Sequence, residues 1–149
     1  MSTDRTDTEG RFPVVIQRTR LIKTNDSGDQ QLVDYEGLAG EKPTEVLRAM
    51  PHGLASHSPP ESEAVVLSGG GSRDLPMVVG SESPQHRPRN LPEGATMLYD
   101  TAGSKVYLDA DGTINVETNK AVNLKSPTIT IEASTQLTFK SPSIDFQEG

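Results

Sequence analysis

Along much of the chain, hydrophobic and polar residues alternate with the period of two that is typical of β-strands. Between residues 11 and 81, short runs of this kind are separated by clusters of Gly, Pro, Asn and Asp, which favour turns. These runs predict strands at 12–22, 31–36, 64–68 and 77–80.

A fifth run, at 43–50, fits either a strand or a helix beginning at Pro43, because it is too short for its period to decide. The runs at 64–68 and 77–80 flank the glycine-rich segment Gly69–Asp74, which predicts a hairpin. About five short strands in some 70 residues favour a small Greek-key barrel, so we expect an OB-like domain over 11–81.

Three further segments follow from composition. Residues 1–10 are polar and predict a flexible tail rather than a signal peptide. Residues 82–93 are rich in proline and predict an extended linker, after which the chain contains no arginine. Beyond it, at 94–149, we expect a hairpin built from 95–100 and 105–109, leading into a repetitive C-terminal segment.

The C-terminal segment repeats with a period of 15 residues, since Leu124–Ile131 aligns with Phe139–Phe146. Its apolar residues change between even and odd positions at Ser126-Pro127 and at Ser141-Pro142. A shift of one residue in strand alternation marks a corner of the chain. The pattern therefore predicts short strands joined by tight corners, as in a β-helix.

Two or three such repeats cannot bury their own apolar face, and both strand edges would stay open. Closure by identical chains around one axis solves both problems, and a three-sided prism needs three chains, although the pattern alone does not fix that number. The fold expected is all-β, with an OB-like barrel followed by an intertwined triple-stranded β-helix in a homotrimer. The side chains predicted to fill the trimer core are Ile114, Val116, Val122, Leu124, Ile129, Ile131, Leu137, Phe139, Ile144 and Phe146.

The composition of the chain excludes several classes of function. The chain has no cysteine, a net charge of −7 and only 4% aromatic residues, and no apolar run approaches the length of a membrane span. Such a chain is poorly suited to bind nucleic acid, which is held by Lys, Arg and aromatic side chains. We expect no nucleic-acid partner.

The sequence motifs that could suggest a catalytic or ligand-binding site are better interpreted as turns and loops. Gly69–Asp74 lacks the Gly-Lys-Ser/Thr end of a phosphate loop, and Asp109–Gly112 lacks the further ligands of a calcium loop. His52, His57 and nearby glutamates are spread through a proline-rich loop, and Ser56, His57 and Asp74 come without a nucleophile elbow. We therefore expect no enzyme, no metal and no cofactor.

In the order and spacing of several segments, the chain resembles the phage baseplate assembly protein V family, in its Mu-like branch. The resemblance covers roughly 12–146. It is carried by Val15–Arg18, Gly53–His57, Glu63–Ser68, Gly71–Asp74, Leu91–Gly94, Leu98–Asp100 and Gly103–Leu108.

The resemblance implies a homotrimeric spike in the virion, at the tip of the tail tube, assembled in the host cytoplasm. It implies contacts with baseplate hub and tail-tube proteins, and piercing of the host outer membrane when the sheath contracts. The alternatives are an OB-fold binding module and a trimeric tail adhesin without a piercing role.

In one respect the chain departs from the family. Many members carry a C-terminal His-x-His pair that binds an apical iron, whereas the three histidines here, His52, His57 and His86, all precede the repeats. An iron-bound apex is therefore not expected. Either Phe146 side chains close a blunt tip, or a separate small protein caps it.

Overall fold

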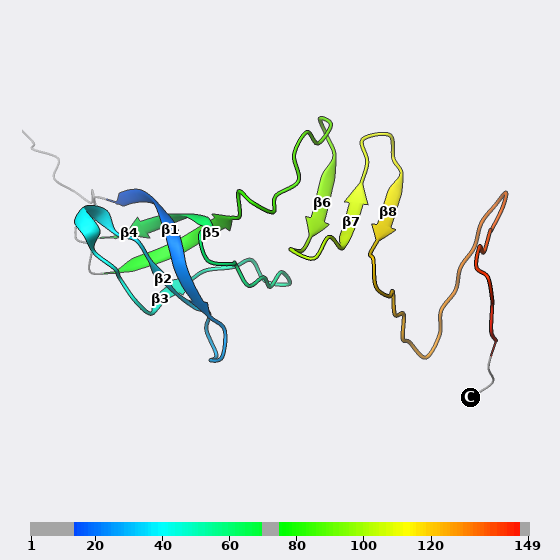
Figure 1. Ribbon diagram of the computed structural model, residues 1–149, viewed down its shortest axis with the longest axis horizontal. Coiled ribbons are helices and arrows are strands. Elements are labelled where there is room, and N and C mark those ends of the chain that lie inside the picture. The colour runs from blue at the N-terminus through cyan, green and yellow to red at the C-terminus, as the bar shows by residue number, and fades with distance from the viewer. Residues whose placement is uncertain (1–13, 70–74, 147–149) are drawn as a thin grey trace, which may run out of the picture. The chain divides into compact units, whose positions relative to one another are not determined.

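The computed structural model describes residues 14–69 and 75–146 and is all-β apart from one short 3-10 turn, η1 (Figure 1). The predicted tail 1–10 and most of the turn 69–74, Asp74 included, lie outside the described residues. The elements are β1 (Val15–Asn25), β2 (Leu32–Tyr35), η1 (Leu38–Gly40), β3 (Val46–Arg48), β4 (Glu63–Ser68), β5 (Pro76–Glu82), β6 (Thr96–Tyr99), β7 (Lys105–Leu108) and β8 (Ile114–Glu117).

The first five strands form a closed barrel in the order β1-β2-β3-β5-β4. β3 and β5 run parallel and the other neighbours antiparallel, so the predicted five-stranded barrel is confirmed. The predicted hairpin is the β4–β5 pair. The ambiguous segment at 43–50 contains β3, a strand rather than a helix, because Leu47 lies between Leu32 and Met77 on neighbouring strands.

A small core fills the barrel. Alternate residues on each strand point inward, and the buried apolar side chains are Leu21, Val33, Tyr35, Val46, Ala64, Val66 and Val78. Each of the larger aliphatic side chains contributes roughly 1.5–3 kcal/mol on burial. Among the described residues, the core of the barrel thus consists of seven apolar side chains.

Arg48 fixes the loop between β3 and β4 to the barrel. Its guanidinium donates to the Gln31 amide oxygen, to the Ser56 carbonyl oxygen at 2.6 Å and to the Ser81 hydroxyl at 2.8 Å. The residue is only 8% exposed, and its Nε has no hydrogen-bond partner among the described residues. Burial lowers the pKa of Arg48, and the charge of Asp26 opposes that shift.

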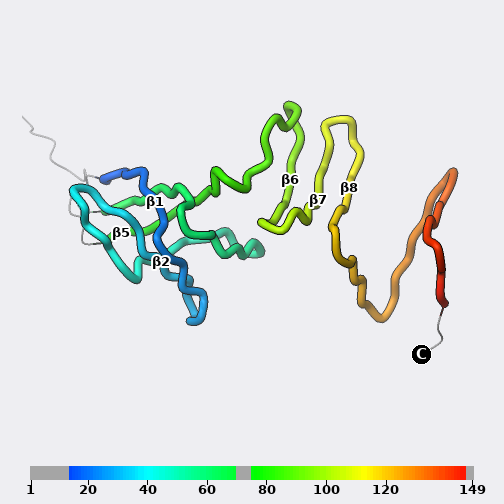
Figure 2. The backbone as a smooth tube through the Cα atoms, in the orientation of Figure 1, coloured from blue at the N-terminus to red at the C-terminus, as the bar shows by residue number. Residues whose placement is uncertain are grey.

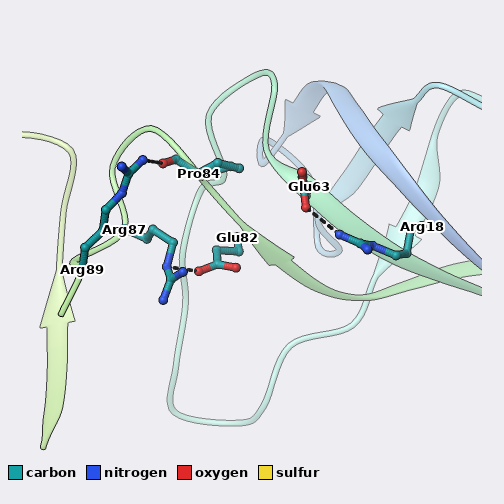
Figure 3. A network of polar contacts seen from close by, with 6 residues as sticks. All are labelled: Arg18, Glu63, Glu82, Pro84, Arg87 and Arg89. Atoms are coloured by element: carbon teal, nitrogen blue, oxygen red, sulfur yellow. Dashed lines mark hydrogen bonds and ion pairs between the residues drawn. The ribbon is translucent and has the colours of Figure 1, made fainter. Parts of the chain in front are cut away.

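The predicted linker makes a turn rather than running straight. The backbone N–H groups of His86 and Arg87 donate to the Ser83 carbonyl oxygen. Figure 3 shows two further contacts: Arg87 Nε pairs with Glu82 Oε1 at 2.5 Å, and Arg89 donates to the Pro84 carbonyl oxygen at 3.1 Å. Local polar contacts therefore hold the chain where it leaves β5.

A second sheet follows, with the order β6-β7-β8 and antiparallel neighbours. β6 and β7 are the predicted hairpin. β8 adds a strand that the sequence pattern assigns to the C-terminal repeats, because Ile114 and Val116 are paired with Leu108 and Val106. The tight turns before and after β7 each need a residue at positive φ, which Gly103 and Gly112 supply.

The chain divides into two units, with the boundary between Glu117 and Thr118. In the second unit the described residues, 118–146, form no strand within one chain. They form neither helix nor strand over 121–126, 128–133 and 136–141, with bends at 119–120, 127, 134–135 and 142, and the chain turns back on itself within this unit (Figure 2). The bends recur every 15 residues, and two of them fall on the predicted Ser-Pro corners.

Candidate self-association surface

One face of the β6-β7-β8 sheet is almost entirely apolar. Leu98, Val106 and Val116 form one cross-strand row. Thr96, Leu108 and Ile114 form the neighbouring row, two residues away on each strand and therefore on the same face. We call the five hydrophobic residues Leu98, Val106, Leu108, Ile114 and Val116 the apolar sheet face.

In the part of the chain that the structure describes, this face stays largely open to solvent. Leu98, Leu108, Ile114 and Val116 are all exposed, and Val106 is half-buried. Exposed apolar side chains that are contiguous, rather than scattered singly, mark surfaces that associate.

The apolar residues continue at regular intervals beyond the sheet. The stretch 121–126, between two bends, carries Val122 and Leu124, and the stretch 128–133 carries Ile129 and Ile131. After them come two more pairs, Leu137 with Phe139 and Ile144 with Phe146. Within each pair the residues are two positions apart, so extended backbone presents both on one side.

All ten residues predicted for the trimer core are exposed in the single chain, by 50% to 89%. Two of them, Ile114 and Val116, lie on the apolar sheet face, and the other eight lie in the C-terminal unit. That they meet in a trimer core stays a prediction.

Sequence reasoning missed three members of the apolar sheet face, Leu98, Val106 and Leu108. A signal for them exists: they occupy even positions, as do Ile114, Val116, Val122 and Leu124. The loop of a hairpin decides whether the even-numbered residues of its two strands share one face of the sheet. The sequence pattern alone does not show which register the loop imposes.

The opposite face of the sheet is polar and aromatic. Lys105 and Glu117 are cross-strand partners, with Nζ and Oε2 3.1 Å apart. Tyr107 lies beside Asn115 on this face, and desolvation together with the nearby Asp109 raises its pKa. The sheet thus has one face suited to water and one that is not.

Carboxylates fix the two turns of the sheet. Asp100 Oδ1 accepts hydrogen bonds from the backbone N–H groups of Ser104 and Ala102, both at 2.8 Å, and the bond from Ser104 contributes most to lowering its pKa. Asp111 Oδ1 accepts from the Thr113 N–H at 2.8 Å, which lowers its pKa in the same way. These acids therefore act in the turns, and the predicted turn at Asp109–Gly112 is confirmed.

Other candidate chemistry is sparse in the part of the chain that the structure describes. Residues 14–69 and 75–146 contain no group of three or more His, Asp or Glu able to hold a metal. A groove on the barrel is lined by Lys23, Asn25, Leu32, Asp34, Thr44 and Glu45. It offers one ammonium against two carboxylates and no aromatic ring, which disfavours nucleic acid.

Over the same described ranges, no helix has the length and apolar character to cross a membrane.

In a comparison with known families, residues 18–85 match the family described as bacteriophage Mu Gp45, N-terminal. The matched span begins within β1 and ends just after β5, so it coincides with the barrel. A comparison with curated proteins gives no match.

Proposed function

We propose, from the match of the barrel to the family described as bacteriophage Mu Gp45, N-terminal, that the protein is the central spike of a contractile-tail baseplate. In this proposal it is a structural component of the virion. Three copies associate through the apolar sheet face and the C-terminal unit, stand at the tip of the tail tube, and pierce the host outer membrane on sheath contraction.

The observation that carries the proposal is the exposure of a whole apolar series in one chain. Among the described residues, the first three apolar pairs beyond residue 120 each lie on a stretch with a bend at both ends, the fourth follows the bend at 142, and the two types of bend alternate every seven or eight residues. Chains of this shape can wrap around a common axis with every pair pointing inward. Among the described residues, the seven apolar side chains of the barrel core already pack with one another, which supports further copies of the chain as the cover for these pairs.

Piercing requires a shaft that resists axial load, and the proposed arrangement supplies one. Burying each aliphatic side chain contributes roughly 1.5–3 kcal/mol, and every position occurs three times. Hydrogen bonds between chains leave no strand edge open. Unfolding then requires the copies to separate together, so resistance is kinetic as well as thermodynamic.

The outward positions suit a shaft in water. Thr128, Thr130 and Thr138 are strong strand formers, and Lys125 and Lys140 recur one repeat apart. Because the work comes from sheath contraction, the shaft needs no catalytic group. We propose that the protein is not an enzyme and carries no cofactor.

The contacts at the two ends complete the proposal. The barrel end meets hub and tail-tube proteins. At the C-terminal end no His-x-His pair is present to hold an apical iron. The tip is either closed by three Phe146 side chains or covered by a separate small capping protein.

The position in the virion is tested by electron microscopy of phage particles carrying an antibody-labelled epitope on this chain. The proposal predicts label at the tail tip on the tube axis. Label elsewhere on the particle would contradict it and would leave a trimeric adhesin as the better account.

A further inference from the structure

The β6-β7-β8 sheet has two open edges of equal length. β7 lies between β6 and β8, which are four residues each, and neither outer strand is paired with a further strand in the described chain. Open strand edges present unpaired N–H and C=O groups that template pairing with another chain.

The register shows which backbone groups face outward. The Asp100 N–H donates to the Ser104 carbonyl, and the Asp109 N–H donates to the Thr113 carbonyl. Along antiparallel strands, residue pairs that exchange backbone hydrogen bonds alternate with pairs that do not. Counting from these two bonds shows which residues of β6 and β8 turn their backbone N–H and C=O groups away from β7. The backbone groups that point to the open edges are therefore those of Met97 and Tyr99 on β6 and of Ile114 and Val116 on β8.

We propose that β8 of one copy pairs edge to edge with β6 of the next copy, so that three sheets close into a nine-stranded barrel. The partner is a second copy of this chain, and the inference rests on the self-association proposed above. Beyond self-association, this arrangement specifies that the edge of β8 meets the edge of β6 of the next copy, and that the three sheets enclose one interior.

The direction of the strands allows this closure. β6 and β8 are both antiparallel to β7, so they run the same way within one chain. Rotation about an axis along the strands preserves that direction, which makes the contact between copies a parallel strand pair. The contact is head to tail, joining two different edges, and such contacts form closed rings when the rotation permits.

The interior of a nine-stranded barrel is about the size that the inward-pointing side chains of the three sheets can fill. A barrel of about eight strands has an interior just wide enough to be filled by side chains, and nine is close to this. The apolar sheet face supplies Leu98, Val106, Leu108, Ile114 and Val116 from each copy. The Lys105–Glu117 ion pair and Asn115 then remain outside in water.

Disulfide trapping tests the contact, because the chain has no cysteine of its own. Met97 and Asn115 point to the outer face from β6 and β8. Within one chain these strands are two spacings apart, about 9.6 Å, which exceeds the roughly 7 Å limit for a disulfide. Paired edges of two copies lie one spacing apart, about 4.8 Å, which is within reach.

The experiment oxidises the full-length double variant Met97→Cys/Asn115→Cys, and separately Tyr99→Cys/Asn115→Cys and Met97→Cys/Glu117→Cys to sample neighbouring registers. A control variant, Tyr107→Cys/Asn115→Cys, joins directly opposed residues of one chain and should run as a monomer. Each sample is boiled in SDS without reductant. Covalent dimers and trimers as the main bands of at least one test variant are the expected result.

Two failures are distinguishable. If none of the three test variants cross-links while light scattering still gives the mass of three chains, the edge pairing is wrong and the proposed trimer stands. If light scattering gives the mass of one chain, self-association itself fails. As a second measurement, Met97→Pro should weaken the assembly far more than Met97→Ala, because only proline removes the edge N–H. Equal effects of the two would overturn the pairing.

Discussion

Leu108 and Ile114 lie directly opposite each other on β7 and β8, yet both remain open to water, 42% and 67% exposed. A cross-strand pair of this kind normally packs beneath a covering layer, because antiparallel sheets bury one face. Here no layer formed by residues 14–69 and 75–146 covers the pair. This relationship is the local reason for proposing that further copies complete the fold.

A charge on the apolar sheet face should prevent assembly. We expect Val116→Asp to shift the protein from three chains to one, since three carboxylates would be buried together at the axis. The matched control is Asn115→Asp, one residue away on the opposite face. Size exclusion with light scattering measures both, and a trimeric V116D protein would argue against the role of this face.

Truncation of a predicted shaft residue should lower the stability of the assembly. We expect Phe139→Ala to cost about 3–5 kcal/mol for each buried ring, and Lys140→Ala, its outward neighbour, to cost under about 0.5 kcal/mol. Thermal unfolding in dilute SDS compares the two. Equal melting temperatures would show that Phe139 is not in an interior.

Arg48 should stabilise the barrel without affecting assembly. In Arg48→Ala, the Gln31 amide oxygen loses its Arg48 donor inside the protein, while Ser81 keeps only its contact with the Ser58 hydroxyl, and we expect this to cost at least about 1–3 kcal/mol. The control is Arg20→Ala, which removes an exposed ion pair with Glu61 and should cost less than about 1 kcal/mol. Urea unfolding followed by circular dichroism gives both values. A barrel unaffected by R48A would mean that these contacts are dispensable.

Acid should weaken the two turns of the second sheet. Hydrogen bonds from backbone N–H groups lower the pKa of Asp100 and of Asp111 below the ordinary value near 3.8. A lowered folded-state pKa gives stability that is present above the unfolded pKa and is lost as pH falls through the folded pKa.

The loss should therefore begin near pH 4 and grow below it. In Asp100→Asn/Asp111→Asn the amide oxygens keep the turn contacts but do not titrate, so the urea midpoint should fall less between pH 5 and pH 2.5 than in the unchanged protein. Identical slopes would dismiss a contribution from these two acids.

The barrel was predictable because its strands alternate cleanly and its turns carry Gly, Asn and Asp. β3 was ambiguous because three residues show too little of any period, and only its neighbours Leu32 and Met77 define it as a strand. β8 was misplaced for another reason. Ile114 and Val116 occupy even positions, as do the first apolar residues of the C-terminal repeats. The pattern therefore does not reveal that they lie on a strand that pairs with the preceding strand, β7.

The candidate surface was partly predictable from the alternation of apolar and polar residues. Parity identifies which residues share a side of an extended chain, and all ten predicted side chains are exposed. Parity does not say whether the covering partner is the same chain or another. Leu98, Val106 and Leu108 joined the surface only once the register of β6 and β7 was in place.

The most direct test of the central claim is the absolute mass of the full-length protein in solution, measured by light scattering after size exclusion, with and without mild SDS. One chain weighs 16.0 kDa, so we expect about 48 kDa, three times that mass, persisting in SDS. A mass near 16.0 kDa would contradict self-association, and the protein would then be better explained as a monomeric barrel that binds a partner.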